Sequence, residues 1–181
     1  DEAIENLLHV PGSGLMPFYT LHAALIAQVA GQSDRAGTLF VQAQKAMPGY
    51  DMLLTRSHAA WLWNHGQQDK ARAVIRKLVA TDSILGLAGP ALQAEIAHYP
   101  VTSAREGIAR AYVLTAFLLR QQAREQAQQG MEGEGSALNL FQFNEAARLM
   151  LGFALAMDPT LADARLMLAE IQDDAHHFAA A

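Results

Sequence analysis

The chain has 181 residues, of which 51% are hydrophobic and 17% are charged, and its formal net charge is −5. Apolar residues are therefore plentiful enough for a core, which excludes general disorder, and the negative charge disfavours nucleic acid as the main partner. Cysteine is absent, so disulfides, thiolate catalysis and cysteine-ligated zinc are excluded. No stretch approaches the roughly 18 apolar residues that span a bilayer, so we expect a soluble chain without membrane insertion.

A first full pair of helices is predicted over residues 16–50, after a partial repeat helix in residues 1–14. Gly31 can adopt the left-handed conformation that ends a helix, and Ser33 or Asp34 can cap the helix that follows. Small and apolar residues at helical spacing define the faces expected to pack. They are Thr20, Ala23, Ala24 and Ala27 on the first helix, and Ala36, Phe40 and Ala43 on the second.

A second pair of helices is predicted over residues 52–85, with Gly66 at its turn. The same spacing of small and apolar residues recurs on both helices. The packed faces are expected to be Thr55, Ala59 and Leu62, followed by Ala71, Ile75 and Leu78.

Residues 86–108 are predicted to form a connector that contains one short helix, from Pro90 to His98. The sequence Ser103-x-x-Glu106 is typical of a capping box, in which the serine and glutamate side chains bond to main-chain N–H groups at the start of a helix. We therefore expect a long helix to begin at Ala104.

An extended third repeat is predicted over residues 104–158, and a truncated repeat over residues 160–181. Within the third repeat, residues 123–141 are rich in glycine, glutamine and glutamate, a composition typical of solvated loops. We therefore expect a flexible loop there.

One ladder of residues recurs along the chain. Ala36, Phe40 and Pro48 stand at offsets of four and twelve, and Ala147, Leu151 and Pro159 repeat these offsets. Ala71 with Ile75 gives a third copy, in which Ser83 replaces the proline, and Ala3 with Leu7 gives an earlier one. The intervals between the small residues, ending at Ala181, are 33, 35, 76 and 34 residues. A period near 34 residues is typical of helix–turn–helix repeats.

The segments Gly31–Pro48 and Gly66–Ser83 resemble the turn and second helix of a tetratricopeptide repeat, most closely those of bacterial proteins. Neither copy matches the consensus tryptophan of the first helix. The resemblance implies an all-α fold: a right-handed α-solenoid of antiparallel helix pairs over residues 1–181, with a long third repeat. Because the pattern is cut at both termini, it also implies a fragment of a longer array.

No motif for catalysis, a cofactor or a metal is found. Gly12-Ser-Gly14 opens no phosphate-binding helix, and His58 and His65, seven residues apart on one helix, have no third ligand nearby in the sequence. Lys70, Arg72, Arg76 and Lys77 make one helix basic, but the apolar residues between them indicate an ordinary amphipathic helix rather than a nucleic-acid site.

In the tetratricopeptide-repeat proteins that this sequence resembles, the first helices of the repeats line a concave groove that receives a partner. Applied to this sequence, the rule predicts a groove with apolar walls and three arginines that could seat a peptide. Its residues would be Phe18, Leu21, Leu25, Arg56, Trp63, Asn64, Arg110, Phe117 and Arg120. The alternative is that neighbouring repeats or the 86–108 connector cover these side chains.

The sequence therefore predicts a non-enzymatic scaffold that binds a protein or peptide partner. Two alternatives stay open: a helical accessory domain of a larger enzyme, and a module that self-associates through its open repeat ends. The compartment, bacterial periplasm or cytoplasm, is also open, because the sequence contains no targeting segment.

Overall fold

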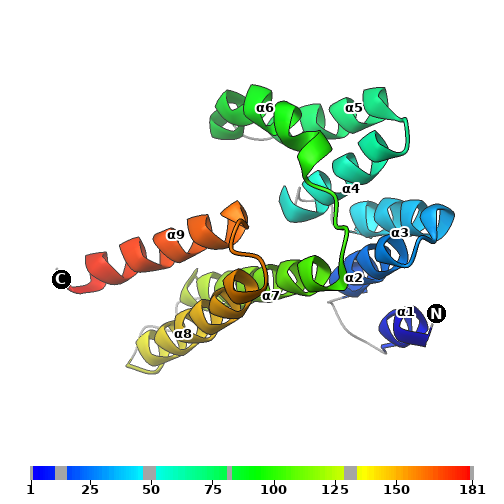
Figure 1. The fold of residues 1–181 in the computed structure, drawn as a ribbon. Helices are drawn as coiled ribbons and strands as arrows, with labels where there is room; N and C mark the ends of the chain where they lie inside the picture. The colour runs from blue at the N-terminus through cyan, green and yellow to red at the C-terminus, as the bar shows by residue number, and fades with distance from the viewer. Residues whose placement is uncertain (1, 11–15, 47–51, 81–82, 129–133, 180–181) are drawn as a thin grey trace. The chain divides into compact units, whose positions relative to one another are not determined.

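The computed structural model describes residues 2–10, 16–46, 52–80, 83–128 and 134–179 (Figure 1). Every regular element in these ranges is a helix, which confirms the all-α prediction. None of the described helices is both long and apolar enough to cross a membrane. The elements are α1 (Glu2–Leu8), α2 (Met16–Val29), α3 (Ser33–Ala46), α4 (Met52–Asn64), α5 (Gln68–Val79), α6 (Ser83–Glu95), the 3₁₀ turn η1 (Ile96–His98), α7 (Ala104–Gln128), α8 (Glu134–Met157) and α9 (Ala162–Ala179).

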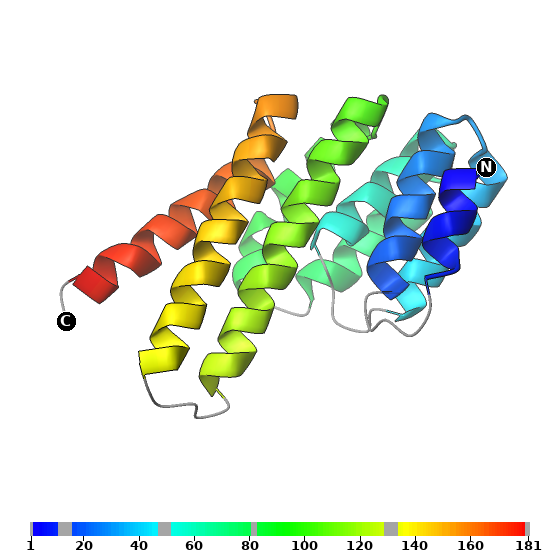
Figure 2. The ribbon, with the colours of Figure 1, turned by 90° about the horizontal axis from the view of Figure 1, so that it is seen from below.

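The chain folds into two compact units, residues 1–107 and residues 108–181, and α7 begins in the first unit and continues in the second. In the first unit, α2 packs against α3 and α4 against α5, while α1 contacts α2 and α6 contacts α5. In the second unit, α7 and α8 lie side by side (Figure 2) and α9 packs on α8.

The two helix pairs of the first unit close with the same turn. Gly31 and Gly66 have φ angles of 73° and 75°, the left-handed region that the sequence predicts for Gly31. The N–H group of the residue after each glycine donates to a carbonyl five residues earlier: Gln32 to Ala27 and Gln67 to Leu62, both at 2.9 Å. This is the Schellman arrangement, which satisfies carbonyl groups that a helix end leaves open.

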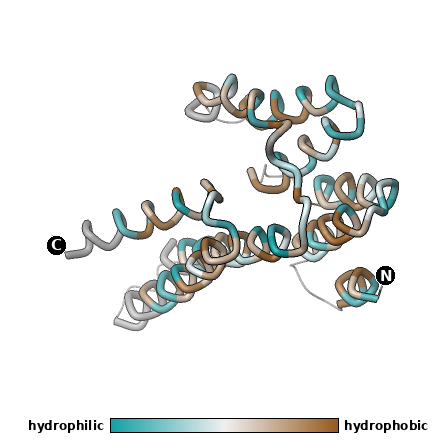
Figure 3. Tube along the Cα trace, viewed as in Figure 1, coloured by the Kyte–Doolittle hydropathy of each residue, from teal (hydrophilic) through white to brown (hydrophobic). Residues whose placement is uncertain are grey.

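The ladder of small and large residues occupies equivalent environments in three helices. Each copy has a small residue at i and apolar residues at i+4 and i+7, and all nine side chains are fully buried. They are Ala36, Phe40 and Ala43 on α3, Ala71, Ile75 and Leu78 on α5, and Ala147, Leu151 and Ala154 on α8. Most of the remaining positions of α3 and α5 are polar, with Leu39, Val41 and Val74 among the exceptions, and Figure 3 shows hydrophilic and hydrophobic residues alternating along both helices. The fold is therefore helical and repeat-like.

The copy predicted at the N-terminus differs from the other three. Ala3 is exposed, and its neighbour Ile4 is the fully buried residue of α1. Helix α1 packs on α2 and buries Ile4 rather than Ala3. Two other parts of the ladder, Pro48 and Ala181, lie outside the described residues.

The connector contains more helix than the sequence predicts. Helix α6 begins at Ser83 rather than at Pro90, and Pro90 lies exposed inside it. Glycine and proline disfavour helix, but packing outweighs that preference here. A Cβ atom added to Gly89 would stand 3.6 Å from the Val79 side chain, which is ordinary van der Waals contact between α6 and α5.

The capping box at the start of α7 is confirmed on its serine side. The Glu106 N–H donates to Ser103 Oγ at 3.2 Å. The Glu106 carboxylate reaches one residue further back than expected and accepts from the Thr102 N–H at 2.7 Å and from the Thr102 hydroxyl at 3.0 Å. The connector is thus tied to the first turn of α7.

The loop predicted over residues 123–141 is helical over most of that range. Helix α7 continues to Gln128 and α8 begins at Glu134, while residues 129–133 lie outside the described part of the chain. Glutamine, glutamate and arginine are good helix formers, a preference that outweighs the solvated-loop composition. Helix α9, Ala162–Ala179, lies within residues 160–181, where the truncated repeat was predicted.

Candidate functional site

The predicted groove residues of the first unit differ widely in exposure. Leu21 and Leu25 on α2 are 0% and 3% exposed, so they belong to the core and offer no surface to a partner. Phe18 and Trp63 are half-buried, and Trp63 lies under the Arg72 guanidinium at 5.3 Å. Asn64 is exposed, and its amide donates to the Ala60 carbonyl at 2.8 Å.

The connector covers Arg56, as the alternative interpretation of the sequence allowed. The Arg56 guanidinium lies 3.9 Å from the centroid of the Tyr99 ring and donates to Glu95 Oε2 at 3.1 Å. A second contact with the connector comes from α2, where the Gln28 amide donates to the Val101 carbonyl at 2.7 Å. These contacts hold the connector against α2 and α4, on the side where the groove was predicted.

The remaining predicted groove residues lie on α7, in the second unit. Arg110 is buried, and Phe117 is 38% exposed. Arg120 is 6% exposed and donates to Glu170 Oε2 at 2.5 Å, which joins α7 to α9. An arginine in this position holds its own unit together. Of the three, Phe117 presents the most surface to solvent.

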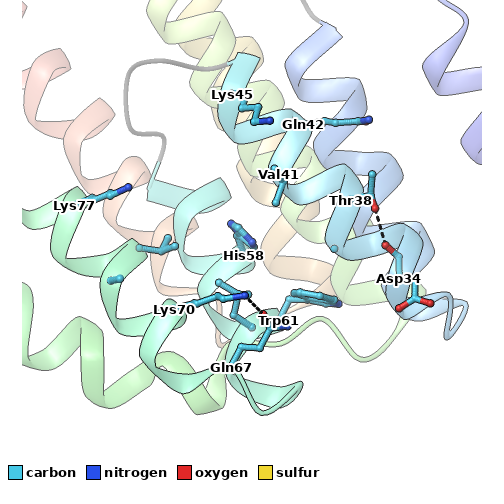
Figure 4. Close-up of a pocket in the computed structure, with 14 residues that line it drawn as sticks. Asp34, Thr38, Val41, Gln42, Lys45, His58, Trp61, Gln67, Lys70 and Lys77 are labelled. Carbon is cyan, nitrogen blue, oxygen red and sulfur yellow. Dashed lines mark hydrogen bonds between the residues drawn. The ribbon is translucent and has the colours of Figure 1, made fainter.

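An open groove lies on the other side of α4, between α3 and α5 (Figure 4). Its volume is about 840 Å³, within the range of ligand-binding clefts. We call it the α3–α5 groove. Its lining consists of Asp34, Gly37, Thr38, Val41, Gln42 and Lys45 from α3, His58, Trp61 and Leu62 from α4, Gln67 from the turn, and Lys70, Ala73, Val74 and Lys77 from α5.

The position of Trp61 in the floor of the groove depends on Gly37. A Cβ atom at position 37 would stand 2.5 Å from Trp61 Cη2, closer than any side chain tolerates. The indole therefore lies directly on the glycine backbone of α3. In the turn that follows α4, the His65 ring stacks on the indole, with ring centroids 4.4 Å apart. Trp61 Nε1 is buried and has no hydrogen-bond partner among the residues that the structure describes.

His58 is the second ring in the floor. It stacks on Phe40 with centroids 5.5 Å apart, and its Nδ1 lies 2.8 Å from Gln44 Oε1. Burial lowers the pKa of His58 from 6.5 to about 4, because a charged imidazole loses its hydration there. The ring is therefore neutral near pH 7, and the floor of the groove carries no charge.

The rim of the groove is positively charged. Lys45, Lys70 and Lys77 surround the hollow, and Asp34 is the acidic residue of the lining (Figure 4). Lys70 Nζ donates to Gln67 Oε1 at 2.9 Å. Lys45 and Lys77 form no ion pair with any residue in the described part of the chain. This cationic rim stands on a chain whose formal net charge is −5.

The sequence interpretation missed this groove because it treated each helix alone. Lys70 and Lys77 were attributed to an ordinary amphipathic helix, and no residue of α3 was assigned to a binding surface. The sequence feature that could have indicated the groove is Gly37, a glycine in the interior of a helix. Such a residue weakens a helix and often marks a close approach by another group.

Metal binding finds no geometric support in the part of the chain described. There, no three histidine, aspartate or glutamate side chains gather as a ligand set. His58 is bonded to Gln44, and His65 lies between the Trp61 carbonyl at 2.7 Å and Ser33 Oγ at 3.1 Å. Both histidines thus have protein partners.

Comparison of the chain with protein-family models, with curated proteins and with solved structures finds no match.

Proposed function

We propose that this chain is a non-enzymatic protein-binding module, a right-handed α-solenoid of tetratricopeptide type. Its partner contributes a peptide segment that lies in the α3–α5 groove. The observation that carries the proposal is the open hollow of about 840 Å³ between two repeated helices, with a formed aromatic floor. The nine equivalent buried positions of the ladder and the two matching glycine turns support the repeat architecture.

The proposed site is this groove rather than the face of the first helices. Leu21 and Leu25 are buried there, and Arg56 is under the connector. The α3–α5 groove, in contrast, exposes Val41 to 43% and has polar side chains at its edges. An apolar floor with a polar rim is the usual anatomy of a protein interface.

The polar groups of the groove favour contact over catalysis. Catalytic acid–base groups usually have a pKa near the working pH, whereas the pKa of His58 is lowered to about 4. The Thr38 hydroxyl donates to the Asp34 carbonyl at 2.9 Å, so a local main-chain acceptor holds its proton. No nucleophile in the lining is hydrogen-bonded to a base among the described residues.

Peptide selection tests this proposal. Random 12-residue peptides displayed on phage are selected on the chain and then measured against the Ala73→Trp variant. Ala73 is half-buried in the lining, so the indole fills the hollow without a change of charge. Ala91→Trp, at an exposed position of α6 outside the groove, is the matched control.

We expect the selected peptides to bind the wild type and Ala91→Trp equally, and to lose binding to Ala73→Trp. The proposal is wrong if selection yields no binder, or if the selected peptides bind Ala73→Trp as well as they bind the wild type. Far-ultraviolet circular dichroism establishes that both variants are folded.

A further inference from the structure

The chain contains three lysines, and all three line the α3–α5 groove. Only 14 of the 181 residues form this lining. The other ten basic residues of the chain are arginines, and none of them is in the lining. Lysine is thus concentrated at one surface, and that surface is the one with an open, uncharged floor.

Helix electrostatics explain two of these lysines but not the third. Lys45 and Lys77 lie in the last turns of α3 and α5, where the helix dipole favours a cation. Lys70 lies in the first turn of α5, where the same dipole disfavours it. The helix dipole therefore does not account for the presence of Lys70 beside the groove.

We propose that the segment bound in the α3–α5 groove is an acidic peptide: aspartate or glutamate side chains flank an apolar side chain that rests on the floor. This inference rests on the proposed function and names the chemistry of the partner. Carboxylates complement the three ammonium groups of the rim, and an apolar side chain covers Val41, Val74 and the edge of the aromatic floor.

Nucleic acid is the other polyanion that three lysines could attract, and the observations favour peptide over it. The floor is apolar and is held by packing against α3, whereas phosphate-binding surfaces carry dense positive charge. The lining carries three lysines together with the Asp34 carboxylate, which is less positive charge than a phosphate backbone usually meets. The rim is therefore suited to a few separated carboxylates around one apolar anchor.

Fluorescence anisotropy with a designed probe tests the inference. The probe is a fluorescein-labelled 12-residue peptide of glutamate and leucine, and its controls are the same peptide with lysine in place of glutamate and a 12-nucleotide oligothymidylate. The protein variants are Lys70→Glu with Lys77→Glu in the groove, and Arg105→Glu with Arg124→Glu at two exposed positions on α7 outside it. Both double variants change the net charge equally.

We expect the glutamate peptide to bind the wild type and the arginine variant alike, and to bind the lysine variant about tenfold or more weakly. Raising the salt concentration weakens the wild-type complex for the same reason. The inference is overturned if the lysine variant binds the glutamate peptide normally, if the lysine peptide binds the wild type as tightly, or if oligothymidylate binds with the same dependence on Lys70 and Lys77.

Failure of this inference is distinguishable from failure of the proposed function. If phage selection yields peptides that Ala73→Trp rejects but that are not acidic, the groove binds peptides and the chemistry named here is wrong. If neither selected peptides nor the glutamate peptide depend on Ala73, both proposals are wrong.

Discussion

The two sides of helix α4 have different surroundings: the connector covers one side, and the other side lines an open groove. On one side Arg56 is closed in by Tyr99 and Glu95 of the connector. On the other side His58 and Trp61 form the floor of an open groove between α3 and α5. The repeat pattern alone does not decide which face of a helical hairpin receives a partner. In this chain the connector, which is not part of the repeat pattern, packs against one face of α4 and leaves the other face open.

The largest loss of stability is expected for a substitution in the core, beneath the open side of α4. Phe40 is fully buried and stacks under His58, so Phe40→Ala removes a large side chain and leaves a cavity. We expect the free energy of unfolding to fall by about 3–5 kcal/mol. Val41→Ala, at the adjacent and 43% exposed position, should change it by less than about 1 kcal/mol. Urea denaturation measures both, and equal losses would contradict the placement of Phe40.

Acid should destabilise the floor of the groove. The folded pKa of His58 is lowered to about 4, so between about pH 4 and 6.5 the unfolded chain binds more protons than the folded chain. The effect of His58 on the free energy of unfolding is therefore small above about pH 6.5. As the pH falls toward 4, proton binding by His58 in the unfolded chain lowers the free energy of unfolding by about 2–3 kcal/mol. His22 on α2, whose pKa burial also lowers, acts in the same direction.

The pH dependence is measured by urea denaturation in steps from pH 7.5 to pH 4.5. His58→Phe should make the curve flatter, since it removes the titrating group and keeps a ring against Phe40. A His58→Phe curve with the wild-type slope would show that His58 is not buried as described.

Replacement of glycine by alanine should destabilise the protein at Gly37 and stabilise it at Gly152. In Gly37→Ala the new Cβ would overlap the Trp61 ring, so we expect a loss of about 1–2 kcal/mol despite the better helix propensity of alanine. In Gly152→Ala the new Cβ meets nothing within 4 Å, so we expect a gain of about 0.5–1 kcal/mol. Melting temperatures that move in the same direction for both variants would contradict the contact between Gly37 and Trp61.

A small effect is expected on the covered side. Arg56→Ala removes the contact with the Tyr99 ring and the ion pair with Glu95, which together should contribute about 1 kcal/mol. Because these contacts hold the connector locally, amide hydrogens near Tyr99 should exchange faster in the variant. Arg105→Ala, at an exposed position on α7, is the control. Unchanged exchange in the Arg56 variant would show that other contacts hold the connector.

The sequence was most informative where structure depends on neighbours along the chain. Gly31, Gly66 and the ladder through Ala36, Ala71 and Ala147 were predicted because turn chemistry and helical periodicity are local properties. Helix α6 was predicted too short because packing of Gly89 against Val79 is not visible in a sequence that contains proline.

The groove could not be predicted in the same way. Its lining combines residues 34–45 with residues 58–77, and no single helix carries its pattern. The buried state of Leu21 and Leu25 was also hidden, because an apolar residue on a helix looks the same whether a partner or the core covers it. Only the contacts of the folded unit separate these cases.

Lysine reactivity tests the central claim, that the open side of α4 binds the partner, most directly. The intact chain is acetylated with and without the glutamate–leucine peptide, and mass spectrometry measures the extent of modification at Lys45, Lys70 and Lys77. We predict that bound peptide slows acetylation of all three lysines several-fold, while the amino terminus reacts at an unchanged rate. Saturating peptide that leaves the three lysines as reactive as before would contradict the account.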